Sequence, residues 1–173
     1  MAKNGLYELK NELKAGARPN KYRIAINSKE SSGPTEDQMD ILCKAASLPE
    51  AAIGTIDVYN QGRKLVIAGD KTYTSAWDVT FYNTREMDIK NKMEEWMKRI
   101  DDVQSHNREW EENSEYMTDM EVHQLNGENI ETAKYKLYNV WPSNISSVDL
   151  ADDSQDTVSE FTVTFTYSHW EKV

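Results

Sequence analysis

The side chains in this sequence that could carry chemistry are one cysteine, three histidines and a group of aspartates. Cys43 lies among apolar neighbours in the run ILCKA, which favours a small buried residue on a strand over a reactive thiol with a histidine partner. The histidines are far apart and have ordinary neighbours, so each is interpreted as structural or surface-exposed. They are His106, His123 and His169.

The aspartates gather in the run DLADDSQD (149–156), which raises the question of a calcium site. This run lacks the central glycine and the terminal glutamate of an EF-hand loop, so it predicts a solvated turn. The sequence contains no GxxxxGK[ST], GxGxxG, CxxC or HExxH motif, and no nucleophile is paired with a base. We therefore expect no catalytic residues, no metal and no cofactor, and a protein that is not an enzyme.

The length and net charge of the chain further limit the class of protein. A chain of 173 residues fits a single domain (1–173), and its apolar runs are far too short to span a membrane. Its 20 basic and 30 acidic residues give a net charge of −10. Such a surface repels phosphate backbones and anionic membranes, which argues against a protein that grips DNA. It is compatible with a surface past which DNA slides.

Two helices are predicted from apolar spacing. Leu6, Leu9 and Leu13 lie three and four residues apart and predict an amphipathic helix within an N-terminal arm (1–17). A longer helix is predicted at 86–104, where one apolar stripe should pack on a sheet while the charged residues face solvent. The stripe consists of Ile89, Met93, Trp96, Met97 and Ile100.

Alternation of apolar and polar residues predicts about seven antiparallel strands. Gln61-Gly62 should form a hairpin tip, and Gly69-Asp70 a further turn. Together with the helices, this pattern predicts a mainly β fold, a β-sandwich or barrel with one flanking helix. The expected strands are 20–27, 39–46, 53–59, 63–67, 76–82, 132–141 and 157–167, with a further strand at 145–150 left open.

The last strand and the acidic stretch suggest surfaces with distinct roles. In the last strand, Thr162, Thr164 and Thr166 share the face opposite the apolar side chains, so this face should line water or pair across subunits. Residues 101–121 hold eight acidic residues against Arg108 alone, and we interpret them as an exposed acidic loop.

Several stretches, taken in order, resemble the tail tube proteins of contractile-tailed, myovirus-type bacteriophages. The more specific parts are AGDKTY-W-VTFYN (68–83) and VWPSN (140–144). The resemblance covers most of the chain but not the acidic stretch. The stretches are ARPNKYRIAI (17–26), CKAASLPEAAIGTIDV (43–58), GRKLVIAGDKTYTSAWDVTFYN (62–83), YNVWPSNISSVDL (138–150) and FTVTFTYSHWE (161–171).

The resemblance implies a structural protein rather than a catalyst. In that family six copies form a ring, strands of neighbouring copies join into an inner barrel, and the rings stack into a tube inside a contractile sheath. The implied partners are further copies of the chain, the tail sheath protein, the baseplate tube initiator and the tail terminator. The tape-measure protein and DNA would occupy the lumen transiently. The implied location is the virion tail, assembled in the host cytoplasm, with no membrane partner.

Two kinds of alternative stay open. Within the same class, the chain could be the tube protein of a related contractile injection or secretion system, or a baseplate tube initiator. From a different class, it could be a monomeric β-sandwich that binds a carbohydrate on its aromatic surface. Most aromatic residues fall on the apolar side of alternating strands, where the core is the default, so the second alternative is less favoured.

Candidate contact residues follow from this hypothesis. The segment Leu48–Lys64 is expected to mediate ring stacking, because it holds more apolar area than a free loop should expose. The competing interpretation is that Ile56 and Val58 are ordinary core. The predicted interface is Arg18, Pro19, Asn20, Leu48, Pro49, Ile53, Ile56, Val58, Tyr59 and Arg63. The acidic residues expected to face the sheath, with the lumen as the competing location, are Glu109, Glu111, Glu112 and Glu115.

Overall fold

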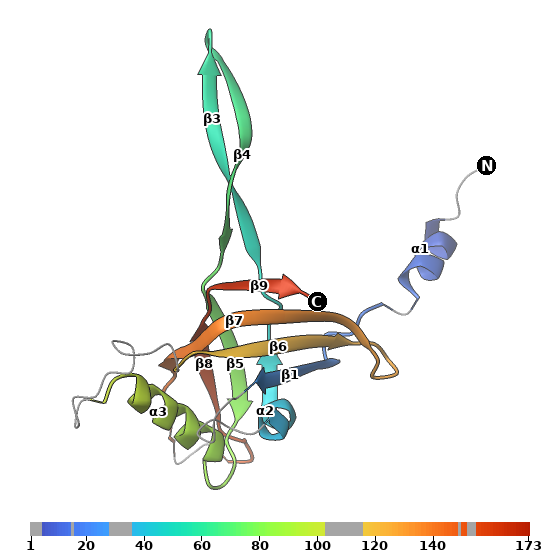
Figure 1. Ribbon diagram of the computed structural model, residues 1–173. Coiled ribbons are helices and arrows are strands. Elements are labelled where there is room, and N and C mark those ends of the chain that lie inside the picture. Colours follow the sequence, from blue (N-terminus) through green and yellow to red (C-terminus); the bar gives the residue numbers. More distant parts are fainter. Residues whose placement is uncertain (1–4, 15, 28–35, 103–115, 149, 152–154) are drawn as a thin grey trace.

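The computed structural model is mainly β and antiparallel, and it describes residues 5–14, 16–27, 36–102, 116–148, 150–151 and 155–173. These ranges hold three helices and nine strands, whose ribbons are shown in Figure 1. They are α1 (Gly5–Leu13), β1 (Tyr22–Asn27), α2 (Glu36–Leu42), β2 (Cys43–Ala46), β3 (Ala51–Asn60), β4 (Arg63–Tyr73), β5 (Ala76–Tyr82), α3 (Asp88–Ile100), β6 (Thr118–Leu125), β7 (Glu131–Ile145), β8 (Glu160–Thr166) and β9 (His169–Lys172).

The long strand β7 joins two groups of strands into one sheet of order β1-β6-β7-β8-β5-β2, with β9 also paired to β7. The first part of β7 pairs with β6 and β9, and its last residues, Trp141 to Ile145, pair with β8. Asn139 has a φ of 55° between the two parts, a conformation that asparagine tolerates better than most residues. The predicted mainly β antiparallel fold is confirmed, although the described strands do not close into a barrel.

The core lies between these strands and α3. On β8, Phe161, Val163 and Phe165 are buried, as is Tyr167 directly after it, which confirms the predicted alternation of the last strand. The ring centroid of Phe165 lies 5.8 Å from that of Trp77 and 6.3 Å from that of Trp96 on α3. Aromatic side chains bury large apolar areas, so these contacts help to hold α3 on the sheet.

The helix α3 packs as its stripe predicts. Ile89, Met93 and Trp96 are buried, and the Trp96 indole N–H donates to the Tyr116 carbonyl at 2.8 Å. The helix runs from Asp88 to Ile100, shorter than the expected 86–104. It begins at Asp88 because Met87 has a left-handed backbone (φ 54°), and it ends at Ile100 because Asp101 is extended (φ −144°).

Two elements project from the body, which is the seven-stranded sheet with α2 and α3. The hairpin of β3 and β4 forms a separate two-stranded sheet that projects beyond β9, and α1 lies out to the side (Figure 1). The hairpin turns at Gln61 and Gly62, both at positive φ, where the sequence predicts the tip. This two-stranded element is called the β3–β4 hairpin.

Three sequence expectations differ from the structure. Residues 39–42 were expected in a strand and lie in α2, because Met39 and Leu42 are spaced for one helical face and a short apolar run does not decide between the periods. The expected turn at Gly69-Asp70 is absent, since β4 continues through it to Tyr73.

The β4 strand continues there because two glycines allow close contact between the strands. A Cβ on Gly69 would lie 3.1 Å from the carbonyl oxygen of Gly54, and the register shifts between Ile53 and Thr55. The third difference concerns β6, which begins at Thr118 inside the expected acidic loop and whose buried Met120 and Val122 alternate with charged residues. The short strand β9 was not predicted.

Candidate assembly surface

The β3–β4 hairpin carries an apolar face with no partner in the described chain. The register places Ile56 opposite Ile67 and Val58 opposite Leu65, so all four side chains share one face. They are between 42% and 62% exposed, which shows that Ile56 and Val58 are not core residues of the single chain. This set (Ile56, Val58, Leu65 and Ile67) is called the hairpin apolar face.

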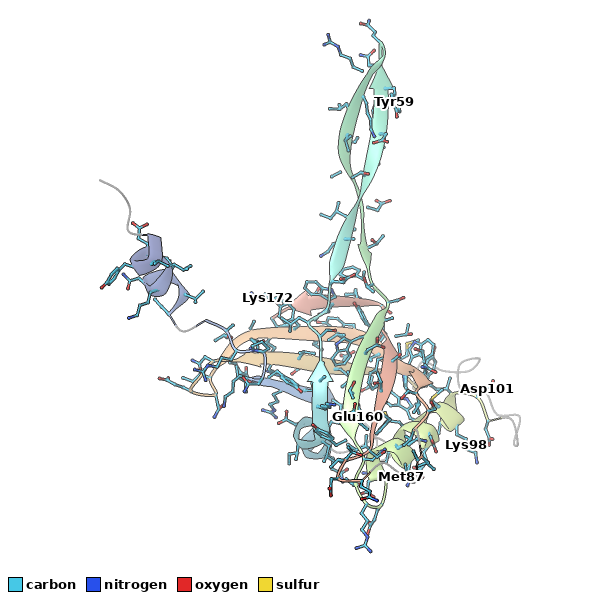
Figure 2. All side chains as sticks on the ribbon, turned by 180° about the vertical axis from the view of Figure 1, so that it is seen from behind. Tyr59, Met87, Lys98, Asp101, Glu160 and Lys172 are labelled. Atoms are coloured by element: carbon cyan, nitrogen blue, oxygen red, sulfur yellow. The ribbon has the colours of Figure 1, made fainter. Side chains whose placement is uncertain are left out.

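The opposite face of the hairpin is more polar. Tyr59 lies opposite Lys64, and the Lys64 ammonium is 2.8 Å from the Asp57 carboxylate. Figure 2 shows Tyr59 on the projecting part of the hairpin, far from Lys172 on β9. A two-stranded hairpin is at best marginally stable alone in water, so an apolar face of this size is a candidate contact surface.

The remaining predicted interface residues lie at the tip, at the root and in the N-terminal arm. Arg63 follows the tip, and Ile53 is an exposed residue of β3. Leu48 and Pro49 form part of the connection between β2 and β3, where Leu48 is exposed. The structure thus gathers all the hairpin residues of the prediction on one protruding element.

The N-terminal arm is a second exposed element. The side chains of Leu6, Leu9 and Leu13 on α1 are 57% to 80% exposed, so the apolar stripe of this helix is open to solvent. The carbonyl of Arg18 accepts hydrogen bonds from the Lys21 N–H and the Gln124 side chain, each at 3.1 Å. The exit of the arm, with Pro19 and Asn20, is therefore tied to β6 while the helix beyond it is free of the sheet (Figure 1).

The threonine face lies on the outer side of β5 and β8. The hydroxyl oxygens of Thr80 and Thr162 are 3.0 Å apart, and the Thr164 hydroxyl donates to the Asp78 carboxylate at 2.6 Å. Thr162, Thr164 and Thr166 are half-buried, and Asp78 is exposed. This is a hydrogen-bonded polar wall with a negative charge at Asp78, and the exposed Lys44 at its edge is paired with Glu160.

A charged face on β6 and β7 was missed by the sequence analysis. The Lys136 ammonium lies 3.1 Å from the Asp119 carboxylate, and the Lys134 ammonium lies 2.9 Å from that of Glu121. His123 on the same face is only 5% exposed, with its Nδ1 3.1 Å from Glu131. Alternating acids on β6 opposite alternating lysines on β7 are the sequence signal that could have revealed it.

The expected sheath-facing residues cannot be placed. Glu109, Glu111, Glu112 and Glu115 lie outside the described residues, as does His106. Of the other two histidines, His123 is buried in the charged face beside Glu121 and Glu131, and His169 stacks on Tyr138 with centroids 4.7 Å apart.

The chemistry available in the described part of the chain is modest. No group of three or more histidine, cysteine or acidic side chains could hold a metal ion there. Among the helices described, none has the length and apolar character that crossing a membrane would need. Cys43 is half-buried, and its carbonyl accepts a hydrogen bond from the Tyr22 hydroxyl at 3.1 Å.

The fold and the surfaces define a class first: an antiparallel β protein with two protruding arms whose apolar faces its own described residues do not cover. A family model described as phage tail tube protein matches residues 16–173. The chain therefore belongs to the phage tail tube protein family, a family of structural proteins of the bacteriophage tail. The resemblance drawn from the sequence is confirmed.

Individual relatives agree with this assignment. The tail tube protein gp19 of Enterobacteria phage T4 is 28% identical over 156 residues, which cover 90% of this chain and 91% of the relative. The tail tube protein of Serratia phage KSP90 is 26% identical over 152 residues, which cover 87% of this chain and 85% of the relative.

Solved structures share the fold at lower identity. One chain of an extracellular contractile injection system, from its PVC sheath/tube terminator in the extended state, gives a TM-score of 0.63 at 12% identity, covering 90% of this chain and 95% of that one. A chain of the anti-feeding prophage baseplate gives 0.61 at 12% identity, covering 88% and 90%. At such identities the likeness shows the fold alone.

Cys43 should react slowly with alkylating reagents. Burial raises the pKa of the Cys43 thiol, and the hydrogen bond from Tyr22 opposes this shift without cancelling it. Less thiolate is then present at pH 8, so alkylation by iodoacetamide should be on the order of tenfold slower than that of free cysteine. Mass spectrometry of timed samples measures this rate. A rate equal to that of free cysteine, in the folded protein, would contradict the assignment of Cys43 as a structural residue.

Proposed function

We propose that this chain forms hexameric rings that stack into a phage tail tube, the conduit for DNA inside a contractile sheath. The observation that carries the proposal is the hairpin apolar face, exposed on a protruding element of a chain that belongs to the tail tube family. Contact with further copies would bury it, and each fully buried aliphatic side chain contributes about 1.5–3 kcal/mol. The role is structural and involves no catalysis and no cofactor.

The partners follow from this role. The chain would contact further copies of itself, the sheath protein, the baseplate tube initiator and the tail terminator, with tape-measure protein and DNA transiently in the lumen. Assembly would take place in the host cytoplasm, and the product is the virion tail. Relatives at 26% and 28% identity are phage tail tube proteins, which favours this over a tube of another injection system or a baseplate tube initiator.

Two arms would make the contacts between copies. The β3–β4 hairpin is the proposed ring-to-ring contact, through the hairpin apolar face, Tyr59 and Ile53. The helix α1 is the second arm, because a helix of nine residues is marginal alone in water and exposes its whole leucine stripe. The anchored turn at Arg18, Pro19 and Asn20 would direct α1 toward the neighbouring copy.

The threonine face would line the lumen or the contact between neighbouring strands. Thr162 and Thr164 are satisfied by hydroxyl and carboxylate partners within the chain, so this wall tolerates water. Asp78 adds negative charge to it, and carboxylates repel the phosphate backbone. DNA could then pass this wall without being held.

Negative-stain electron microscopy tests the proposal directly. The purified chain should form sixfold rings or tubes with a pore a few nanometres wide, alone or after addition of nucleating baseplate. Sedimentation that finds only monomers at high concentration, with no assembly on baseplates, would overturn it. A dispersed monomer that binds carbohydrate would instead support the alternative class.

Replacing Val58 and Tyr59 with aspartate should abolish long tubes. The two carboxylates would have to be buried without partners in the proposed stacking contact, which costs far more than the lost apolar area. Folded subunits or single rings should remain, because both positions are exposed in the single chain. The matched control, Val58→Ile with Tyr59→Phe, keeps the apolar area and should give normal tubes. Long tubes from the aspartate variant would remove the hairpin from the stacking contact.

Replacing Glu109, Glu111, Glu112 and Glu115 with glutamine should leave tubes intact and weaken their association with the sheath. The stretch follows α3, whose charged side faces solvent, and sixfold repetition in a narrow bore would crowd its charges within a Debye length of ~8 Å. Each exposed pair contributes about 0–1 kcal/mol, so the loss should appear over many repeats and should shrink with salt. Cosedimentation of tubes with sheath protein over a salt series measures it. Sheath binding that is unchanged and insensitive to salt would assign the acids another role.

A further inference from the structure

The connection that leads into the β3–β4 hairpin is held by two tryptophans. This connection runs from Ser47 to Glu50, between β2 and β3. The Trp77 indole N–H donates to the Ser47 carbonyl at 2.8 Å, and the Trp170 indole N–H donates to the Glu50 carbonyl at 3.0 Å. Both ends of a four-residue segment are thereby fixed to the body, with Pro49 restricting the backbone between them.

The strand that returns from the hairpin reaches the same ring. Tyr73, the last residue of β4, packs edge-on against Trp170 with centroids 6.1 Å apart and an interplanar angle of 79°. The Thr74 hydroxyl donates to the Glu50 carboxylate at 2.7 Å. The Lys71 ammonium lies 5.4 Å from the centre of the Trp170 ring. The outgoing and returning chain therefore meet on one indole.

Trp170 itself is firmly seated. It lies on β9, pairs with Leu137 on β7, and packs edge-on against Tyr135 with centroids 5.5 Å apart. The strand β7 is a central member of the sheet, so Trp170 links the hairpin root to the most connected strand of the body. Beyond the root, every residue of β3 is exposed, so the described body gives the hairpin little further support.

We propose that Trp170 is a positioning residue that holds the root, so that the β3–β4 hairpin already points in its assembly direction in the free subunit. A hairpin without this clamp would swing about the connection, and its ordering would have to be offset by the contacts that assembly forms. Trp77 fixes the other end, but it also fills the core. Trp170 is half-buried at the edge of the core, so its replacement should disturb the core less than replacement of the fully buried Trp77. The assembly half of this inference rests on the proposed function.

The direction of the hairpin can be measured in the free subunit. Nitroxide labels on Asn60→Cys near the tip and Glu95→Cys on α3, in a Cys43→Ser background, report their distance by electron double resonance. Trp170→Leu should roughly double the width of the distance distribution, because the indole hydrogen bond and the ring contacts are both lost. Trp170→Phe keeps the ring contacts and should broaden it less. A distribution for Trp170→Leu as narrow as the parent's would overturn the proposal.

A matched tryptophan supplies the control. Trp141 is also half-buried and packs edge-on against Tyr116, with centroids 6.3 Å apart, but it lies at the other end of β7. Trp141→Leu should leave the distance distribution unchanged, and urea unfolding of each variant shows that the body is folded. If Trp170→Leu does not fold, Trp170→Phe still decides, because a distribution identical to the parent's would then count against the indole hydrogen bond as the clamp.

Assembly tests the second half. If the hairpin is preorganised by Trp170, the concentration at which rings or tubes appear should be about tenfold higher for Trp170→Leu than for the parent. Trp141→Leu should assemble at the same concentration as the parent. A broad distribution with an unchanged assembly concentration would overturn preorganisation. If the parent itself never assembles, the proposed function fails, whereas the distance measurement on the free subunit still decides whether Trp170 is the clamp.

Discussion

A two-stranded β ribbon cannot bury its own apolar side chains, and this constraint determines which apolar side chains of the molecule stay exposed. The ribbon has two faces and no second layer, so Ile56, Val58, Leu65 and Ile67 stay exposed however well their strands pair. The body has the opposite character, because α3 and the strands enclose an aromatic core around Phe165. One chain thus combines a body with its own core and an arm whose apolar side chains the described residues leave exposed.

The surfaces of the body are correspondingly polar, but in different ways. The outer side of β5 and β8 is built from hydroxyl pairs with a carboxylate, and its hydrogen bonds are satisfied locally. The outer side of β6 and β7 is a ladder of opposite charges, in which Lys134 and Lys136 lie against Glu121 and Asp119. Lys134 and Lys136 are thus neutralised in place on this face.

Much of the fold could be predicted wherever one period was long and unambiguous. The alternation from Phe161 to Tyr167 correctly predicted a strand, and the apolar stripe of α3 correctly predicted a helix. Around Met39 the apolar run was too short to choose a period, and at Gly69 the glycine indicated a turn although its use is a close approach of two strands. Because of the acidic residues around Met120, this stretch was interpreted as a loop, although it forms a strand that buries alternate side chains.

The candidate surface was harder to predict than the fold. The alternation at Ile56 and Val58 is equally consistent with core and with contact, and only the projection of the hairpin shows that they lie outside the core of the single chain. The proposed role of Trp170 depends on its hydrogen bond to Glu50, 120 residues earlier in the chain, and no local pattern encodes such a contact.

The close contact between Gly54 and Gly69 affects how easily the β3–β4 hairpin can twist. Cross-strand side-chain pairs stiffen a ribbon, and Gly54 and Gly69 supply none where their backbones meet. Cross-strand side-chain support of the ribbon is therefore weakest at this point, between the root and the paired tip. A sideways load on the tip would twist the ribbon there, while the root keeps its direction. In the proposed tube, this twist would let neighbouring rings bend relative to each other while their contacts stay closed.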